Sequence, residues 1–121
     1  MEHCVNLNIH WDAPREVWQK ISEVYETMPY WVKNNNAPLW VGENIHLCAS
    51  VEPSGLQISG KMPDDIWEEW YSDLKKKLTV ALGYEIGEPE EGYEFIYYKR
   101  KQNSFLKILL KRKNKKETIK C

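Results

Sequence analysis

The feature that most constrains the fold is the order in which strand-type and helix-type hydrophobic patterns follow each other along the chain. Apolar side chains occupy every second position of residues 4–11, which predicts a strand with one buried face. From about residue 13 to 28 the apolar residues recur at helical spacing. Asp12 is expected to cap this helix, with Pro14 in its first turn and Pro29 ending it.

The second half of the chain repeats these periods in the order strand, strand, helix, strand. Alternation over 45–51 and again from Leu56 to Ile58, across a Pro-Ser-Gly turn, predicts a hairpin. Pro63 opens an amphipathic helix that Gly83 ends. A final strand is expected from Tyr93 to about residue 98, and a short strand near Leu39 within the irregular segment 29–43.

The element order β-α-β-β-α-β predicts an α+β fold of the ferredoxin-like type. In that layout two helices cover one face of a four-stranded antiparallel sheet, and each strand has one apolar and one polar face. The expected domain spans residues 1–98, and residues 99–121 form a basic C-terminal extension.

Charge is sorted by position along the chain. Residues 1–97 contain 7 Lys/Arg and 17 Asp/Glu, whereas residues 98–121 contain 10 Lys/Arg and 1 Asp/Glu. The acidic body argues against nucleic acid as a ligand of the folded part and favours a basic partner. The extension is open to three interpretations: a solubilising tail, a helix lying on the acidic body, or a contact with membrane or nucleic acid.

Several features favour a cytoplasmic protein without a membrane span. The N-terminus does not resemble a secretory signal, and no apolar run approaches the length that crosses a bilayer. Three cysteines, Cys4, Cys48 and Cys121, are an odd number without close pairing, as is common in a reducing compartment.

Neither a cofactor nor a catalytic centre is expected. His10, His46 and Cys48 are predicted to share the open face of the sheet, but their spacing matches no usual zinc pattern and no Cys-His nucleophile signature. Phosphate-binding glycine motifs are absent from the sequence. The predicted open face also lacks the basic, aromatic character of an RNA-recognition module.

Aromatic and acidic side chains form the candidate binding surface. Tryptophan is frequent, with six residues, and is favoured both in cores and in binding hot spots. The aromatic residues of segment 29–43 are expected either to fold onto the core or to contact a partner. The candidate partner-binding residues are Tyr30, Trp31, Trp40, Glu68, Glu69, Asp73, Glu85, Glu88, Glu90 and Glu91.

The chain resembles the small immunity proteins of bacterial polymorphic toxin and contact-dependent growth inhibition systems. The resemblance covers residues 1–97 and is carried by three stretches, Pro29–Trp40, Ser50–Lys61 and Leu82–Tyr93. No residue role carries over from that class. The resemblance implies a cognate toxin, often a basic nuclease, that an acidic and aromatic surface would bind and block.

Two alternatives remain open at this point. The polar face with His10, His46 and Cys48 would serve a small-ligand-binding or dimerising regulatory domain of ferredoxin-like fold. The same three residues would carry the chemistry of an enzyme.

Overall fold

The computed structural model describes residues 2–34 and 37–96 of the chain. The predicted extension 99–121, with Cys121, lies outside the described residues. The elements are β1 (Glu2–Leu7), α1 (Arg15–Thr27), β2 (Leu39–Gly42), β3 (Ile45–Glu52), β4 (Gly55–Lys61), α2 (Asp64–Leu82) and the short 3-10 helix η1 (Pro89–Glu91).

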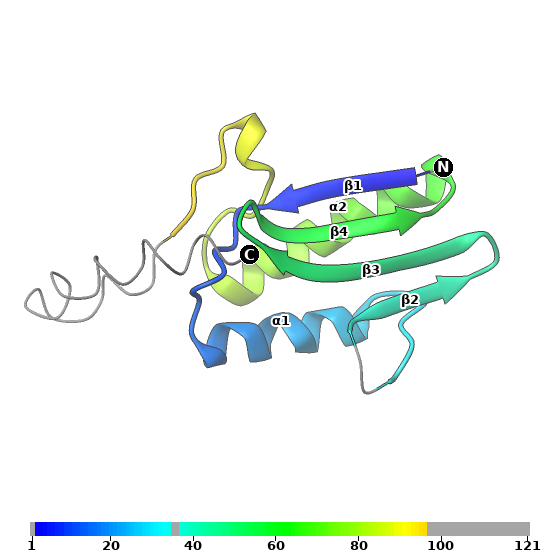
Figure 1. Cartoon of the computed structure of the whole chain (residues 1–121), viewed down its shortest axis with the longest axis horizontal. Helices are drawn as coiled ribbons and strands as arrows, with labels where there is room; N and C mark the ends of the chain where they lie inside the picture. The colour runs from blue at the N-terminus through cyan, green and yellow to red at the C-terminus, as the bar shows by residue number, and fades with distance from the viewer. Residues whose placement is uncertain (1, 35–36, 97–121) are drawn as a thin grey trace, which may run out of the picture.

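The four strands form one antiparallel sheet in the order β1-β4-β3-β2 (Figure 1). Two tight turns join β2 to β3 and β3 to β4, and Asn44 in the first turn has a left-handed φ of 60°. Asparagine tolerates that conformation better than most residues, which suits it to a two-residue hairpin. The hairpin predicted over residues 45–58 is confirmed by the antiparallel pairing of β3 with β4.

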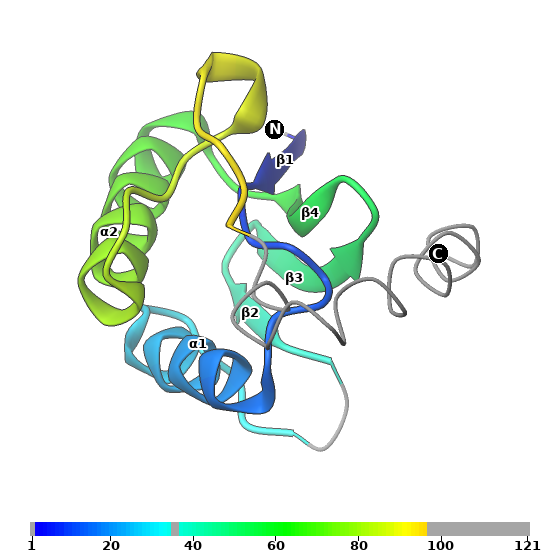
Figure 2. The same ribbon diagram turned by 90° about the vertical axis from the view of Figure 1, so that its left-hand side faces the viewer.

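Both helices lie on one side of the sheet (Figure 2). Their buried residues join the inward-facing residues of the strands in a single hydrophobic cluster. Leu7 of β1, Leu47 of β3 and Ile58 of β4 are fully buried there, together with Leu74 and Leu78 of α2. The predicted α+β class, with two helices on one face of a four-stranded antiparallel sheet, is confirmed.

The ferredoxin-like topology is wrong. The described elements run β-α-β-β-β-α, and the fourth strand is β2 rather than residues 93–98. Residues 93–96 form no strand, and residues 97 and 98 are not described. One physical reason is visible at Glu94, whose carbonyl accepts a hydrogen bond from the side chain of Asn8 at 2.9 Å instead of joining a ladder.

The start of α1 also differs from the prediction. The helix begins at Arg15, Pro14 occupies the capping position, and no side chain caps it. Asp12 does not act as the cap, because its carboxylate lies 2.6 Å from Nδ1 of His10. Helix α2 ends as expected, with Gly83 in the left-handed region at a φ of 83°.

Candidate protein-binding surface

Asn8 fixes the segment that follows α2. Its side chain is buried, and its amide donates to the carbonyls of Glu85 at 3.0 Å and Glu94 at 2.9 Å. Its side-chain oxygen accepts from the backbone N–H of Gly87 at 2.9 Å, and its own backbone N–H donates to the Gly87 carbonyl at 3.0 Å. The Tyr84 hydroxyl donates to the Asn8 carbonyl at 3.0 Å. This network pairs polar groups whose burial without partners would be costly.

We call residues 85–94 the acidic loop. One further contact holds it against α2, and a second lies within the loop itself. The backbone N–H of Ile86 donates to the Thr79 hydroxyl on α2 at 3.0 Å. The ring of Tyr93 packs on Gly87, where an added Cβ would lie 2.4 Å from the ring. Only glycine leaves room for this contact, so the loop conformation is specified by its sequence.

The acidic loop lies beside the middle of α2. Tyr71 of α2 donates its hydroxyl to Glu88 Oε2 at 2.7 Å. Burial raises the pKa of Tyr71, and the hydrogen bond to Glu88 and the negative charges of Glu88 and Glu91 raise it further. Glu68 lies three residues before Tyr71 and therefore on the same flank of the helix.

These contacts bring part of the predicted set together. We define the acidic surface as Glu68, Glu88, Glu90 and Glu91. Glu68, Glu90 and Glu91 are exposed and Glu88 is half-buried. Glu90 and Glu91 stand on η1, whose backbone returns through Gly92 at a φ of 103°.

A row of stacked aromatic rings lies next to this surface. His3 of β1 stacks on Trp67 with ring centroids 4.3 Å apart, and Trp67 stacks on Tyr71 at 4.7 Å. The Lys75 ammonium lies 4.2 Å from the Tyr71 ring centroid. Tyr71 connects this row of rings to the acidic surface through its hydrogen bond to Glu88.

The aromatic candidates take different places. Trp40 is fully buried, its indole N–H donates to the Tyr25 carbonyl at 3.2 Å, and its ring lies 5.1 Å from that of Trp70. Its place in the predicted surface is therefore wrong, because this side chain belongs to the core. Trp31 is half-buried against Trp40, whereas Tyr30 is 40% exposed with a left-handed φ of 76°.

The remaining carboxylates lie apart from the acidic surface. Asp73 is four residues before Lys77, whose ammonium contacts Thr27 of α1, so Asp73 lies on the α1 side of α2. Glu69 lies on the same side, one turn before Asp73. The exposed Glu85 lines a hollow with Lys75 and other residues.

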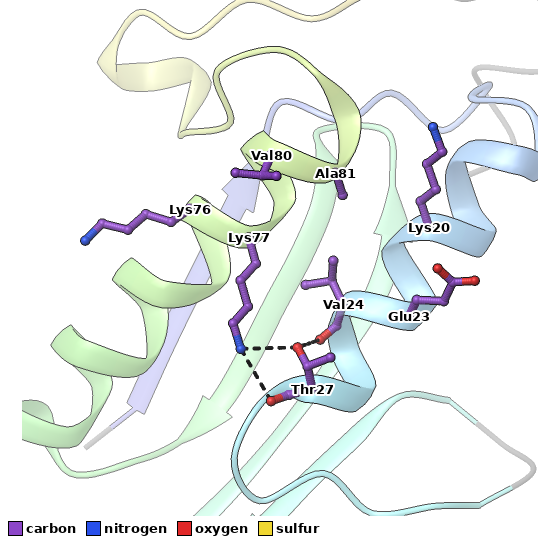
Figure 3. Close-up of a pocket in the computed structure, with 8 residues that line it drawn as sticks. All are labelled: Lys20, Glu23, Val24, Thr27, Lys76, Lys77, Val80 and Ala81. Atoms are coloured by element: carbon purple, nitrogen blue, oxygen red, sulfur yellow. Dashed lines mark hydrogen bonds between the residues drawn. The ribbon is translucent and has the colours of Figure 1, made fainter.

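A groove between α1 and α2 was not expected from the sequence. Its volume is about 730 Å³, and Figure 3 shows the side chains around it. The lining residues are Lys20, Glu23, Val24 and Thr27 of α1 and Lys76, Lys77, Val80 and Ala81 of α2. Val80 is 84% exposed. An apolar residue outside the buried stripe of α2, beside a run of lysines, is the sequence signal that identifies this surface.

His10, His46 and Cys48 do not come together. His46 and Cys48 lie on β3 with side chains on the open face, whereas His10 follows the end of β1 and its ring contacts Trp11 and Phe95. No group of three or more potential metal ligands gathers within the described part of the chain. The prediction that these three side chains share one face of the sheet is therefore wrong. The regulatory and enzymatic alternatives depended on that prediction.

Comparison with known proteins assigns no family, since no family model, curated protein or solved structure matches the chain. Among the described residues, neither helix has the length and apolar character needed to cross a membrane.

Proposed function

We propose that this protein is an immunity protein that neutralises a basic protein toxin by binding it through the acidic surface. It acts stoichiometrically, without a catalytic step of its own. The observation that carries the proposal is the fixed acidic loop, whose backbone is held by hydrogen bonds to Asn8, while Asn8 itself accepts a hydrogen bond from the Tyr84 hydroxyl.

Preorganisation supports a binding role for this loop. A surface loop that is ordered only on binding loses conformational entropy at that moment, and this loss weakens the complex. Here Asn8 and the Tyr93–Gly87 contact order the loop before any partner arrives. Glu90 and Glu91 are exposed on it and are available to lysines and arginines of a partner.

Electrostatics supports a basic partner. Residues 1–97 carry ten more acidic than basic residues, with 17 Asp/Glu against 7 Lys/Arg. Clustered carboxylates steer a basic partner and raise its association rate, and the effect decreases with ionic strength. The resemblance to immunity proteins is consistent with the same class of partner.

The test first asks whether a gene beside this one encodes a basic toxin domain, and then co-expresses the two proteins with growth as the readout, followed by binding kinetics with the purified pair. The test variant is E90K/E91K, which reverses two exposed charges and leaves the Glu88–Tyr71 hydrogen bond in place. The matched control is E16K/E26K, which reverses two exposed charges on α1. We expect the test variant to lower the association rate about tenfold at low salt and to weaken protection.

Three results would oppose the proposal. The first is that the wild-type protein binds no such toxin and leaves growth inhibited. The second is that the two double variants bind equally well. The third is that the association rate of the wild type is independent of salt, which would remove the electrostatic basis of recognition.

A further inference from the structure

The surface that the proposed function leaves unused is the groove between α1 and α2. Val24, Val80 and Ala81 supply its apolar part, and Val80 is 84% exposed beside it (Figure 3). An exposed apolar side chain next to a concave apolar surface loses contact with water when a partner covers both. Such a partner would gain its apolar contacts without rearranging the core.

The rim of the groove is basic. Lys20, Lys76 and Lys77 line it together with one carboxylate, Glu23. The Lys77 ammonium contacts the Thr27 hydroxyl at 3.2 Å and the Thr27 carbonyl at 3.4 Å, both across the two helices. Its positive charge is therefore held near one end of the groove, as Figure 3 shows.

We propose that this groove binds an amphipathic helix of a partner protein that presents an apolar ridge flanked by carboxylates. A groove between two antiparallel helices accepts the ridge of a third helix, and anchors about one turn apart would meet Val24 and Val80. Carboxylates beside the ridge would pair with Lys20 and Lys76. This inference does not depend on the proposed toxin-binding function, since it concerns a different surface of opposite charge.

Other occupants fit the charge or the shape less well. A second copy of the chain docked groove to groove would place three lysines and one glutamate of its own rim against the same set, which is repulsive. The extension contains ten basic residues and one acidic residue and would meet the same repulsion. A bilayer is flat and cannot follow a concave surface. A single small amphiphile would stay largely exposed, because the groove is open along its length.

The test uses the full-length protein and a synthetic peptide as the probe. The probe is an acetylated, amidated helix of about 16 residues with a leucine ridge and glutamates on both flanks. Its control peptide keeps the leucines and replaces every glutamate by lysine. Binding is measured by fluorescence anisotropy at low salt, and backbone amide chemical shifts report where the peptide binds.

Variants of the protein separate the apolar contribution from the charge. We expect V80D to weaken binding at least tenfold, and K20E/K76E to weaken it about tenfold and to increase binding of the lysine peptide. The matched control K33E/K61E changes two exposed lysines that do not line the groove and should bind as the wild type does. Because Val80 is exposed, V80D should fold, and a thermal unfolding curve checks this.

The proposal is supported if the acidic peptide binds, shifts the amides of residues 20–27 and 76–81, and depends on both sets of side chains. It is overturned if V80D and K20E/K76E bind like the wild type, if the lysine peptide binds the wild type equally well, or if no binding occurs. It is also overturned if decanoate, as a small amphiphile, displaces the peptide and binds more tightly than it.

Discussion

The acidic surface and the groove depend on the same helix but are held in place by different forces. The first half of α2 carries Asp64, Asp65, Glu68, Glu69 and Asp73, and the second half carries Lys75, Lys76 and Lys77. This arrangement places negative charge near the positive end of the helix and positive charge towards its other end. The helix dipole therefore favours the charge separation that gives the two surfaces opposite character.

The two surfaces differ in what positions them. The acidic loop has no buried residue in η1 and is held mainly by hydrogen bonds to Asn8, Thr79 and Tyr71, with Ile86 buried in the hydrophobic cluster. The groove needs no such network, because its walls are two helices that pack on the sheet through Ile21 and Leu78. We therefore expect the loop to respond to the loss of single polar groups and the groove to respond mainly to changes in the core.

The largest effect on the free energy of unfolding is expected at Trp40, which packs against both helices. Trp40 contacts Tyr25 of α1 and Trp70 of α2, so Trp40→Ala should lower the free energy of unfolding by about 4 kcal/mol. Urea unfolding measures this, and the milder Trp40→Phe keeps the test usable if the alanine variant does not fold. Tyr30→Ala is the control at an exposed aromatic position and should cost far less. Equal costs for the two residues would contradict the assignment of Trp40 to the core.

The next effect should separate the two surfaces. Asn8→Ala leaves the Gly87 N–H and the carbonyls of Glu85 and Glu94 without their partner, at a cost of about 3 kcal/mol in the free energy of unfolding. Hydrogen exchange should accelerate in residues 85–94 more than in α1. The control is Asn6→Ala, because within the described residues the Asn6 side chain accepts hydrogen bonds from the side chains of Ser54 and Gln57 and none from the loop. Uniform acceleration across the chain would show that the loop is not a separate cooperative unit.

The hairpin of the sheet and the second helix were predictable because they depend on local periodicity. Alternation across a Pro-Ser-Gly turn predicted β3 and β4, and the stripe ending at Gly83 predicted α2. The prediction of a last strand from Tyr93 was wrong because Tyr93 and Phe95 alternate in the same way whether their backbone pairs with a strand or with an asparagine side chain. Short alternation does not distinguish these cases.

The residues that distinguish the two surfaces were harder to predict. Asn8 continues the polar alternation of β1, and nothing near it in sequence indicates that its amide meets a carbonyl 86 residues away. Trp40 lies in a four-residue strand whose buried face is decided by its pairing with Leu47. The groove depends on how two helices pack, which no single periodicity describes.

Tyr71 gives a smaller test that is confined to the acidic surface. Tyr71→Phe removes the hydrogen bond to Glu88 and should lower the free energy of unfolding by about 1 kcal/mol at neutral pH. The folded state also raises the pKa of Tyr71 above its ordinary value of 10.0. As the pH rises above that value, the unfolded chain releases the Tyr71 proton while the folded chain retains it.

The wild-type protein should therefore lose stability above about pH 10, and Tyr71→Phe should lose less of it. Burial also raises the pKa of Tyr25, but that group is present in both proteins, so their difference isolates Tyr71. Urea unfolding over a pH series measures it, with Tyr30→Phe as a control that removes a phenol from an exposed position. Identical pH profiles for the wild type and Tyr71→Phe would contradict the link between Tyr71 and the acidic loop.

The smallest effect is expected at the groove itself. Lys77→Met removes the contacts to Thr27 but keeps most of the apolar stem, and these contacts are exposed to water. The free energy of unfolding should therefore change by less than about 0.5 kcal/mol. Urea unfolding, with Asn8→Ala measured alongside, shows whether one polar contact matters less at the groove than at the loop. A loss above about 1 kcal/mol would mean that the groove, like the acidic loop, depends on hydrogen bonds, and the distinction between the two surfaces would then fail.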